Sequence, residues 1–341
     1  GAESTGVFTT PGINILREDD GYRLAQNRPP VGPMLAKLPL AGALEQVARL
    51  LPICGKAQHF AARRAVDSAR GQISEPTSDV IAALYREQLQ TSLWRFVVEW
   101  PALIGRRQNL ETLRRALRSD DTEVWRDQLR EQLDGLERAV SAAAVLEWIE
   151  RRNCIAARVM SRAMDLDQKF PDFPGSEVLT PGCVIERSQD SRFWPVEEAP
   201  LEPPPCEVGA RAMRRHPFAD SPDLPDGPVT GRLLAQVLDA AFLVDSGPEA
   251  AVMSVDVNSM PAAQSSMGPS PEGVGWAMTV RGPLLHRVVL DDAQADTVER
   301  WDVLAPTDWH FGPHGPVARG LEPLEGSVEP ELVRFFVAGF D

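Results

Sequence analysis

The sequence predicts a mainly helical protein that carries one small antiparallel sheet, an α+β fold. Apolar residues recur at steps of three and four through most of residues 40–165 and again in 230–245, as they do on the buried face of a helix. β-branched and aromatic residues gather, with turns between them, in residues 274–304, which is typical of short strands. Between these regions, residues 167–229 hold 12 of the 30 prolines, so we expect extended chain and loops packed across the helices there.

The chain has 341 residues, enough for one large domain or about two. We expect one unit over residues 1–341. Its parts are a helical half (1–166), the proline-rich extended segment (167–229) and a C-terminal part with a helix and the small sheet (230–341).

Apolar spacing predicts most helices of the first half, and a strongly charged helix is expected around residues 120–138. Residues 1–38 before them are short and mixed, with prolines and glycines that indicate turns. Pro101 should end or kink the third helix, because proline donates no backbone hydrogen bond. The expected helices span residues 40–51, 60–69, 78–118 (one long helix or a helix pair), 120–138 and 139–165.

The C-terminal part should begin with a helix over residues 230–245, capped by Thr230. The expected strands and the last helix follow in order, at residues 274–282, 284–290, 297–304 and 330–340. Four tryptophans are best interpreted as core or interface anchors: Trp194, Trp276, Trp301 and Trp309.

Charge and composition exclude several classes of function. The 35 basic and 49 acidic residues give a net charge of −14, which disfavours nucleic acid and anionic membrane surfaces as partners. No apolar run is long enough for a transmembrane helix, and the first residues do not form a secretory signal, so we expect a cytoplasmic protein. The four cysteines form no Cys-x-x-Cys pair and no disulfide framework.

Three C-terminal motifs follow one another at a familiar spacing. Residues 281–290 read Arg-Gly-Pro-Leu-Leu-His-Arg-Val-Val-Leu, residues 301–310 read Trp-Asp-Val-Leu-Ala-Pro-Thr-Asp-Trp-His, and residues 335–341 read Phe-Phe-Val-Ala-Gly-Phe-Asp. They resemble the C-terminal part of nickel–iron hydrogenase large subunits. That family has a Pro-Arg-Gly strand, a Val-Pro-Thr/Ser-Thr-Trp-Asn turn and a final Ser-Phe-Asp-Pro-Cys-x-x-Cys.

An N-terminal motif extends the resemblance over most of the chain. Residues 51–67 read Leu-Pro-Ile-Cys-Gly-Lys-Ala-Gln-His-Phe-Ala-Ala-Arg-Arg-Ala-Val-Asp. They look like the family's Arg-Ile-Cys-Gly-x-Cys-x-x-x-His-Ala-Leu-Ala-x-x-Arg-Ala-Val-Glu. Residues 70–230 match only weakly. The resemblance implies the hydrogenase large-subunit fold.

The departures from the family pattern decide which chemistry is expected. Four thiolates hold the metal pair in the enzymes, whereas here only Cys54 remains at the N-terminal site, and Ala57 stands at the place of its second cysteine. The given sequence stops at Asp341, where the Asp-Pro-Cys of the last motif would begin. Soft thiolates are the ligands of nickel in such sites, so we expect no nickel site and no hydrogen cleavage.

The residues that remain match the iron half of the site. In the family the iron carries two cyanides and one carbonyl, and an arginine and a Ser/Thr hydroxyl bind the cyanides. By the resemblance, Arg281 and Thr307 are cofactor-binding residues, Cys54 is the metal ligand and His59 is the motif histidine near the site. Val280 replaces the family's proline before the arginine, and His310 replaces its asparagine.

A degenerate large subunit of this kind looks like the HupK/HoxV type of hydrogenase maturation protein. The resemblance implies a scaffold, not an enzyme, that holds or transfers an Fe(CN)₂CO unit transiently. The implied partners are HypC/HypD-type maturation proteins and the hydrogenase large-subunit precursor. The alternative is a metal-free chaperone or placeholder. A third reading is an enzyme with a Cys54 nucleophile, for which only His59 would supply a base.

Each candidate residue also has a purely structural interpretation. Cys54 could be a small core residue, although a helix that starts after Gly55 would favour its thiolate. Arg281 could pair with an acid, and Thr307 could be a turn hydroxyl. His310 and His314 have the spacing of a zinc pair on a helix, but Gly312-Pro313 between them argues against one. Cys154 is expected to be a small buried hydrophobe, and Cys183 and Cys206 to be structural or incidental. His216 and His286 are expected at surface or core positions.

Overall fold

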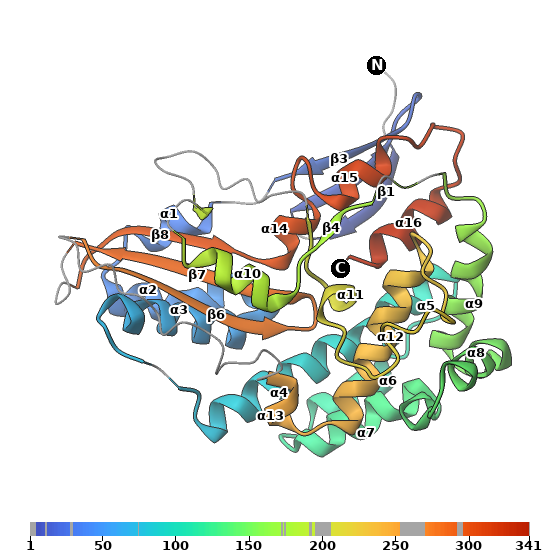
Figure 1. The fold of residues 1–341 in the computed structure, drawn as a ribbon, viewed down its shortest axis with the longest axis horizontal. Coiled ribbons are helices and arrows are strands. Elements are labelled where there is room, and N and C mark those ends of the chain that lie inside the picture. Colours follow the sequence, from blue (N-terminus) through green and yellow to red (C-terminus); the bar gives the residue numbers. More distant parts are fainter. Residues whose placement is uncertain are drawn as a thin grey trace.

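A small sheet, a helical bundle and an N-terminal sheet lie side by side in this computed structural model (Figure 1). The bundle of α4–α9, α12 and α13 occupies the lower right of the figure, and β6–β8 with their covering helices occupy the left. The structure describes residues 5–10, 12–27, 30–73, 75–171, 173, 175–190, 193–194, 206–252, 270–291 and 296–340.

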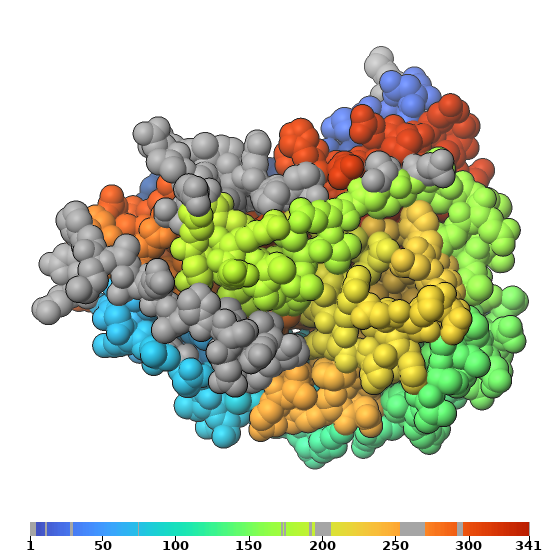
Figure 2. Space-filling model, in the orientation of Figure 1, coloured from blue at the N-terminus to red at the C-terminus, as the bar shows by residue number. Residues whose placement is uncertain are grey.

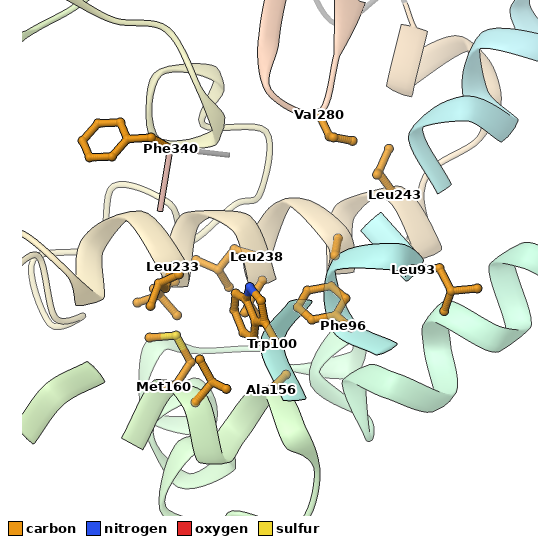
Figure 3. Packing of buried hydrophobic residues seen from close by; sticks show 14 of the residues in the cluster. Leu93, Phe96, Trp100, Ala156, Met160, Leu233, Leu238, Leu243, Val280 and Phe340 are labelled. Carbon is orange, nitrogen blue, oxygen red and sulfur yellow. The ribbon is translucent and has the colours of Figure 1, made fainter. Parts of the chain in front are cut away.

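The bundle helices surround the largest hydrophobic core of the described residues. Figure 3 shows Phe96, Trp100, Met160 and Leu238 converging between α12 and the helices around it. The fold therefore confirms the expected mainly helical class with short antiparallel strands. The bundle helices are α4 (Ser78–Trp94), α5 (Trp100–Leu103), α6 (Leu110–Leu117), α7 (Thr122–Leu133), α8 (Ala142–Arg151), α9 (Ile155–Asp167), α12 (Thr230–Asp245) and α13 (Pro248–Val252).

Pro101 alters the helix without ending it at that residue. The chain passes from α4 through a π-helical segment, Arg95–Glu99, into α5, which ends at Leu103. Pro101 has no N–H for the Val97 carbonyl, which instead accepts the Asn109 N–H at 2.8 Å. The expected helix over residues 78–118 is thus three helices and a π-helical segment.

The expected apolar helix over residues 139–165 is two helices. Arg152 ends α8 in the left-handed region, at φ +52°. Cys154 then caps α9, with its Sγ accepting the Ala157 N–H at 3.4 Å. This cysteine is half-buried against the main core, and it also serves as a helix cap.

The sheet β6–β7–β8 is antiparallel in that order, as the sequence predicts. Its two faces contribute to two hydrophobic clusters, one with α10 and one with α2 and α3. The four tryptophans expected as anchors are all buried. The elements here are α1 (Val31–Leu35), α2 (Leu40–Leu50), a 3-10 turn (Pro52–Cys54), α3 (Gly55–Ala69), α10 (Pro181–Ser188), β6 (Glu272–Thr279), β7 (Gly282–Leu290), β8 (Val298–Leu304) and α14 (Pro306–His310).

An antiparallel sheet near the N-terminus was not expected from the sequence. It packs against the C-terminal helices, and the Tyr22 hydroxyl donates to the Val328 carbonyl at 2.5 Å. The Arg17 side chain likewise donates to the Gly326 carbonyl, at 2.9 Å from Nε. The prediction of one small sheet is therefore wrong. The strands are β1 (Thr5–Thr10), β2 (Ile13–Arg17) and β3 (Tyr22–Gln26), and the helices are α15 (Pro316–Leu321) and α16 (Pro330–Ala338).

The proline-rich segment spreads over the helices. Figure 2 shows its described part from residue 206 onward, in yellow, covering the face between the green helices and α13. It contains α10, the short helix α11 (Ala210–Met213), and a parallel pair of short strands, β4 (Glu177–Val178) and β5 (Cys206–Glu207). The run of three prolines at residues 203–205 lies outside the described residues.

Thr230 does not cap α12 in the expected way. The Asp167 carboxylate, at the end of α9, accepts the N–H groups of Val229 and Thr230 at 2.7 and 2.9 Å, and the Thr230 hydroxyl donates to it as well. A carboxylate from another helix therefore caps α12. None of the helices in the described ranges is long and apolar enough to cross a membrane.

Candidate functional site

Two glycines bring the N-terminal and C-terminal motifs together. A Cβ atom at Gly273 would lie 2.1 Å from the Ala65 carbonyl oxygen, and one at Gly275 would lie 2.0 Å from that of Ala61. A step of two residues forward along β6 therefore corresponds to a step of four residues back along α3. The two steps cover nearly the same distance, because a strand rises about twice as far per residue as a helix. Continued to the end of β6, this register places the turn that carries Arg281 at the Cys54 end of α3.

Cys54 precedes the first residue of α3 and is half-buried against the main core. Ala57, at the position of the family's second cysteine, is buried one turn later. As the residue at the N-cap, Cys54 could accept a hydrogen bond from the first turn, but its side chain makes no capping bond.

Glu87 of α4 occupies the amides at the start of α3. Its two carboxylate oxygens accept the N–H groups of Lys56 and Ala57, at 2.7 and 3.0 Å. These backbone N–H groups, at the start of the helix, are the ones expected from the sequence to favour a Cys54 thiolate. Burial raises the pKa of Glu87, while the two backbone bonds act in the opposite direction.

The next residue of α4 bonds to the strand on the other side. Gln88 is buried, and its amide donates to the carbonyl oxygens of Met278 and Ala251, at 3.4 and 3.3 Å. Consecutive residues of one helix thus bond to the start of α3 and to the end of β6. This confirms from contacts what the glycine register indicates.

The turn that carries Arg281 is fixed by its own hydrogen bonds. The Thr279 hydroxyl donates to the Gly282 carbonyl at 2.8 Å and accepts the Arg281 N–H at 3.1 Å. Gly282 has φ +121°, and a Cβ there would lie 2.2 Å from the Val208 carbonyl oxygen, so only glycine fits. Val280 is buried and projects from the turn toward α12 (Figure 3). Arg281 itself is half-buried.

His310 joins two further segments to this turn. Its Nε2 accepts the Val208 N–H at 3.2 Å, and its Nδ1–H donates to the Phe340 carbonyl at 3.0 Å. These two bonds assign a neutral ring protonated at Nδ1. A Cβ at Gly209 would lie 3.2 Å from His310 Cε1 and 3.6 Å from the Arg281 carbonyl oxygen. The Arg281 turn, α14 and the C-terminal end therefore meet at Gly209.

Thr307 lies on α14 in the same region. Its carbonyl accepts the Phe311 N–H, and the Asp308 carboxylate caps the helix by accepting the Ala305 N–H at 2.7 Å. Thr307 is half-buried. The structure thus places it three residues before His310, on the helix that reaches the Arg281 turn. Asp341, the residue after Phe340, lies outside the described residues.

His59 is not brought to this region. It is exposed on the face of α3 toward α2, and its Nδ1–H donates to the Leu44 carbonyl at 3.1 Å. The buried face of α3 carries its neighbours Ala57 and Gln58 instead. Because the helix turns by about 100° per residue, His59 points away from the face that meets β6.

A buried ion pair supports the region beneath the C-terminal end. Arg232 donates to the Glu207 carboxylate at 2.8 Å, and both side chains are almost fully buried. The Arg232 guanidinium also lies 4.5 Å from the Phe340 ring centroid. Burial lowers the pKa of Arg232, while Glu207 acts in the opposite direction.

His286 has structural partners, and His216 and two further cysteines are not among the residues of the site. His286 is fully buried; its Nε2 donates to Gln58 Oε1 at 2.6 Å, and its Nδ1 accepts the Trp301 Nε1–H at 2.9 Å. Burial lowers the pKa of His286 to about 3. His216 is also buried, and burial raises the pKa of the Cys206 thiol to about 12. Cys183 is exposed.

Cys54 at the start of α3, Arg281 in the turn after β6 and Thr307 on α14 supply one half-buried thiol, one cation and one hydroxyl. No group of three or more His, Cys, Asp or Glu side chains among the described residues could hold a metal ion. A unit that arrives with ligands of its own needs fewer protein ligands than a bare ion. The donors present fit such a unit, with one thiolate at the metal and hydrogen-bond donors for its other ligands.

Several residues of this region were not found by sequence reasoning. Glu87 and Gln88 lie in the stretch that matches the family weakly, and Asp167 and Glu207 lie in or beside the proline-rich segment. Their roles are set by partners between 25 and 190 residues away. No local pattern in the sequence signals them.

Sequence comparison finds relatives over nearly the whole chain, although no family model matches it. The hydrogenase expression/formation protein HupK of Azotobacter vinelandii is 29% identical over 342 residues, covering 95% of this chain and 92% of the relative. The hydrogenase expression/formation protein HoxV of Cupriavidus necator is 22% identical, covering 97% and 90%. HupK of Bradyrhizobium diazoefficiens is 25% identical, covering 93% and 88%.

Solved hydrogenase structures share the fold. The Ni-Fe-Se hydrogenase of Desulfomicrobium baculatum superposes with a TM-score of 0.60 at 16% identity, covering all of this chain and 98% of the matched chain. The Ni-Fe-Se hydrogenase of Desulfovibrio vulgaris Hildenborough gives a TM-score of 0.59 at 14% identity, covering 96% and 94%. At these identities the likeness shows the architecture alone.

Proposed function

Because the chain belongs to the hydrogenase large-subunit-like expression/formation proteins of the HupK/HoxV type, we propose that it acts in the formation of a nickel–iron hydrogenase. In this proposal it is a scaffold that holds or transfers the Fe(CN)₂CO unit of the active site. It binds no nickel and does not turn over hydrogen.

The observation that carries the proposal is the convergence of the two motifs. The α3–β6 register and the bonds of Glu87 and Gln88 bring Cys54 and the Arg281 turn to the same end of the α3–β6 pair. The register thus supports a site to which a thiol and a guanidinium from opposite ends of the sequence both contribute. This is the arrangement that a thiolate-bound unit with anionic ligands requires.

The chain's own residues have distinct tasks toward this cargo. Cys54 would lose its proton on binding, because a thiolate and not a thiol ligates a metal. Arg281 would donate charge-assisted hydrogen bonds to a cyanide nitrogen, and Thr307 would donate a hydroxyl bond to the other. His310 joins the Val208 backbone, which packs against Gly282 of the Arg281 turn, to the Phe340 carbonyl at the C-terminal end. His59 faces α2 and would not contact the iron unit. It would affect the site only by holding α3 in place against α2.

The partners in this proposal are the proteins that supply and receive the unit. HypC/HypD-type maturation proteins would deliver it, and the hydrogenase large-subunit precursor would accept it. This exchange would take place in the cytoplasm. A scaffold of this kind does no net chemistry on its cargo, so the protein would not be an enzyme.

Infrared spectroscopy of protein purified anaerobically from a host with the maturation machinery tests the proposal. Carbonyl and cyanide stretching bands should be present in the unaltered protein and should disappear in Cys54→Ala. Cys183→Ala, an exposed cysteine far along the chain, is the matched control and should keep the bands. Cells carrying Cys54→Ala should also lose hydrogenase activity.

The metal-free chaperone is the outcome that would replace this proposal. It would be indicated by folded protein without carbonyl or cyanide bands, together with full hydrogenase maturation by the Cys54→Ala variant. Bands that survive in Cys54→Ala would instead show that another residue binds the iron.

A further inference from the structure

We propose that Glu87 is a positioning residue for Cys54: it caps helix α3 in place of the cysteine and so keeps the Cys54 sulfur from serving as the helix cap. The geometric part of this inference stands by itself. Its consequence for the iron unit rests on the function proposed above.

The bonds at the start of α3 carry the first step. A residue at the N-cap ordinarily accepts the second or third N–H of its helix with its own side chain. Here these N–H groups belong to Lys56 and Ala57, and both donate to Glu87. The Glu87 carboxylate therefore fills the place that a capping Cys54 sulfur would take.

The same chain shows what a cysteine does when no such carboxylate is present. Cys154 also occupies an N-cap, and its Sγ accepts the third N–H of α9, that of Ala157, at 3.4 Å. The two cysteines are both half-buried. They differ in that Cys154 caps its own helix with its sulfur, whereas Glu87 caps the helix that follows Cys54.

Asp167 provides a matched case at a distance from Cys54. Its carboxylate also reaches across from another helix and accepts two consecutive backbone N–H groups, at the start of α12. Replacement of either carboxylate by its amide removes one charge and one acceptor from a helix start. Only Glu87 lies beside Cys54, so a specific effect on this cysteine separates positioning from general helix stability.

The first arm of the test uses the metal-free, full-length protein. Iodoacetamide labelling at pH 7, followed by mass spectrometry of each cysteine peptide, compares the unaltered chain with Glu87→Gln and Asp167→Asn. In Glu87→Gln an amide released from the carboxylate turns to Cys54 and the nearby negative charge is gone. Both changes stabilise the nucleophilic thiolate, so Cys54 should be labelled several-fold faster.

The controls in this arm come from the chain itself. Asp167→Asn should leave the labelling of Cys54 unchanged. Cys206 is buried, so it would be labelled quickly only if the fold opened. It should therefore stay slowly labelled in both variants. In the unaltered protein the amide protons of Lys56 and Ala57 should resist exchange with solvent. Equal labelling of Cys54 in all three proteins, or rapid exchange of these two amides, would overturn the inference.

The second arm uses protein loaded with the iron unit. A hydrogen bond from a released amide to the Cys54 sulfur draws electron density from the iron, so the carbonyl band of Glu87→Gln should move to higher frequency. Asp167→Asn should leave the band in place, and an unshifted band in Glu87→Gln would count against the inference. If the unaltered protein shows no bands, the proposed function fails, while the labelling arm still decides the role of Glu87.

Discussion

Replacing Gly275 by alanine should weaken the contact between α3 and the sheet. The added Cβ would lie 2.0 Å from the Ala61 carbonyl oxygen and 2.4 Å from the Ala65 backbone nitrogen. Both neighbours are backbone atoms of a helix, so no change of rotamer relieves the contact. The helix that begins at Cys54 would have to move away from β6.

The size of the effect follows from two opposing terms. Overpacking a well-filled interior costs about 3 kcal/mol at the upper end of its usual range, which suits contacts with rigid backbone. Replacing glycine by alanine inside a strand contributes about 1 kcal/mol of stability through the unfolded chain. The net loss should be about 2 kcal/mol, which in a chain of this size lowers Tm by about 3 °C.

Thermal unfolding followed by circular dichroism measures this change. Gly42→Ala is the matched control, because no atom lies within 4 Å of its added Cβ, on helix α2. The same substitution there should raise stability by about 1 kcal/mol. Opposite signs for the two variants are the expected result. A Gly275→Ala protein as stable as the unaltered chain would refute the close contact of α3 with β6, and with it the register that brings Cys54 to the Arg281 turn.

Two further predictions concern buried ionisable groups. Arg232→Met leaves the Glu207 carboxylate buried without its 2.8 Å partner and should cost about 3–5 kcal/mol, a loss that the additional change Glu207→Gln should partly restore in thermal unfolding. The pKa of His286 is about 3 in the folded protein and 6.5 in the unfolded chain, so its contribution to stability is complete above pH 6.5. It should be lost as the pH falls from 6.5 toward 3, by up to about 1.4 kcal/mol per pH unit, and urea titrations at several pH values should show a smaller slope for His286→Gln.

The helices and the C-terminal sheet follow from local patterns in the sequence. Apolar spacing indicates α2, α4 and α12, and the strands β6–β8 follow from β-branched content between turns. These elements bury one face or both faces continuously, so their periodicity is strong. Their boundaries are less well predicted, because Arg152 and Pro101 act on only one turn of helix each.

The N-terminal sheet shows why local pattern is not sufficient. Strands β1 and β3 are mostly exposed or half-buried, so apolar alternation is weak in them. Their position depends on residues about 300 positions away, such as the Val328 carbonyl that accepts the Tyr22 hydroxyl. A pattern within ten residues carries no trace of such a contact.

Some residues of the candidate site are likewise marked by local motifs, whereas others depend on contacts distant in the sequence. Cys54, Arg281 and Thr307 are found because short motifs mark them, and the structure places His59 on the opposite face of α3 although the same motif contains it. Glu87 has no motif, since a carboxylate on an amphipathic helix is usually solvated surface. Only the packing of α4 against the start of α3 gives it a role.

The contact between the two ends of the chain determines when the fold can close during synthesis. Strands β1–β3 pack on residues 316–340, and His310 needs the Phe340 carbonyl to complete its two bonds. At about 5–20 residues per second, about 15–60 s pass between the synthesis of residue 54 and that of residue 340. Throughout this interval the nascent chain presents Cys54 without α16 or Phe340. A site that depends on both ends therefore forms only after translation has passed the last helix.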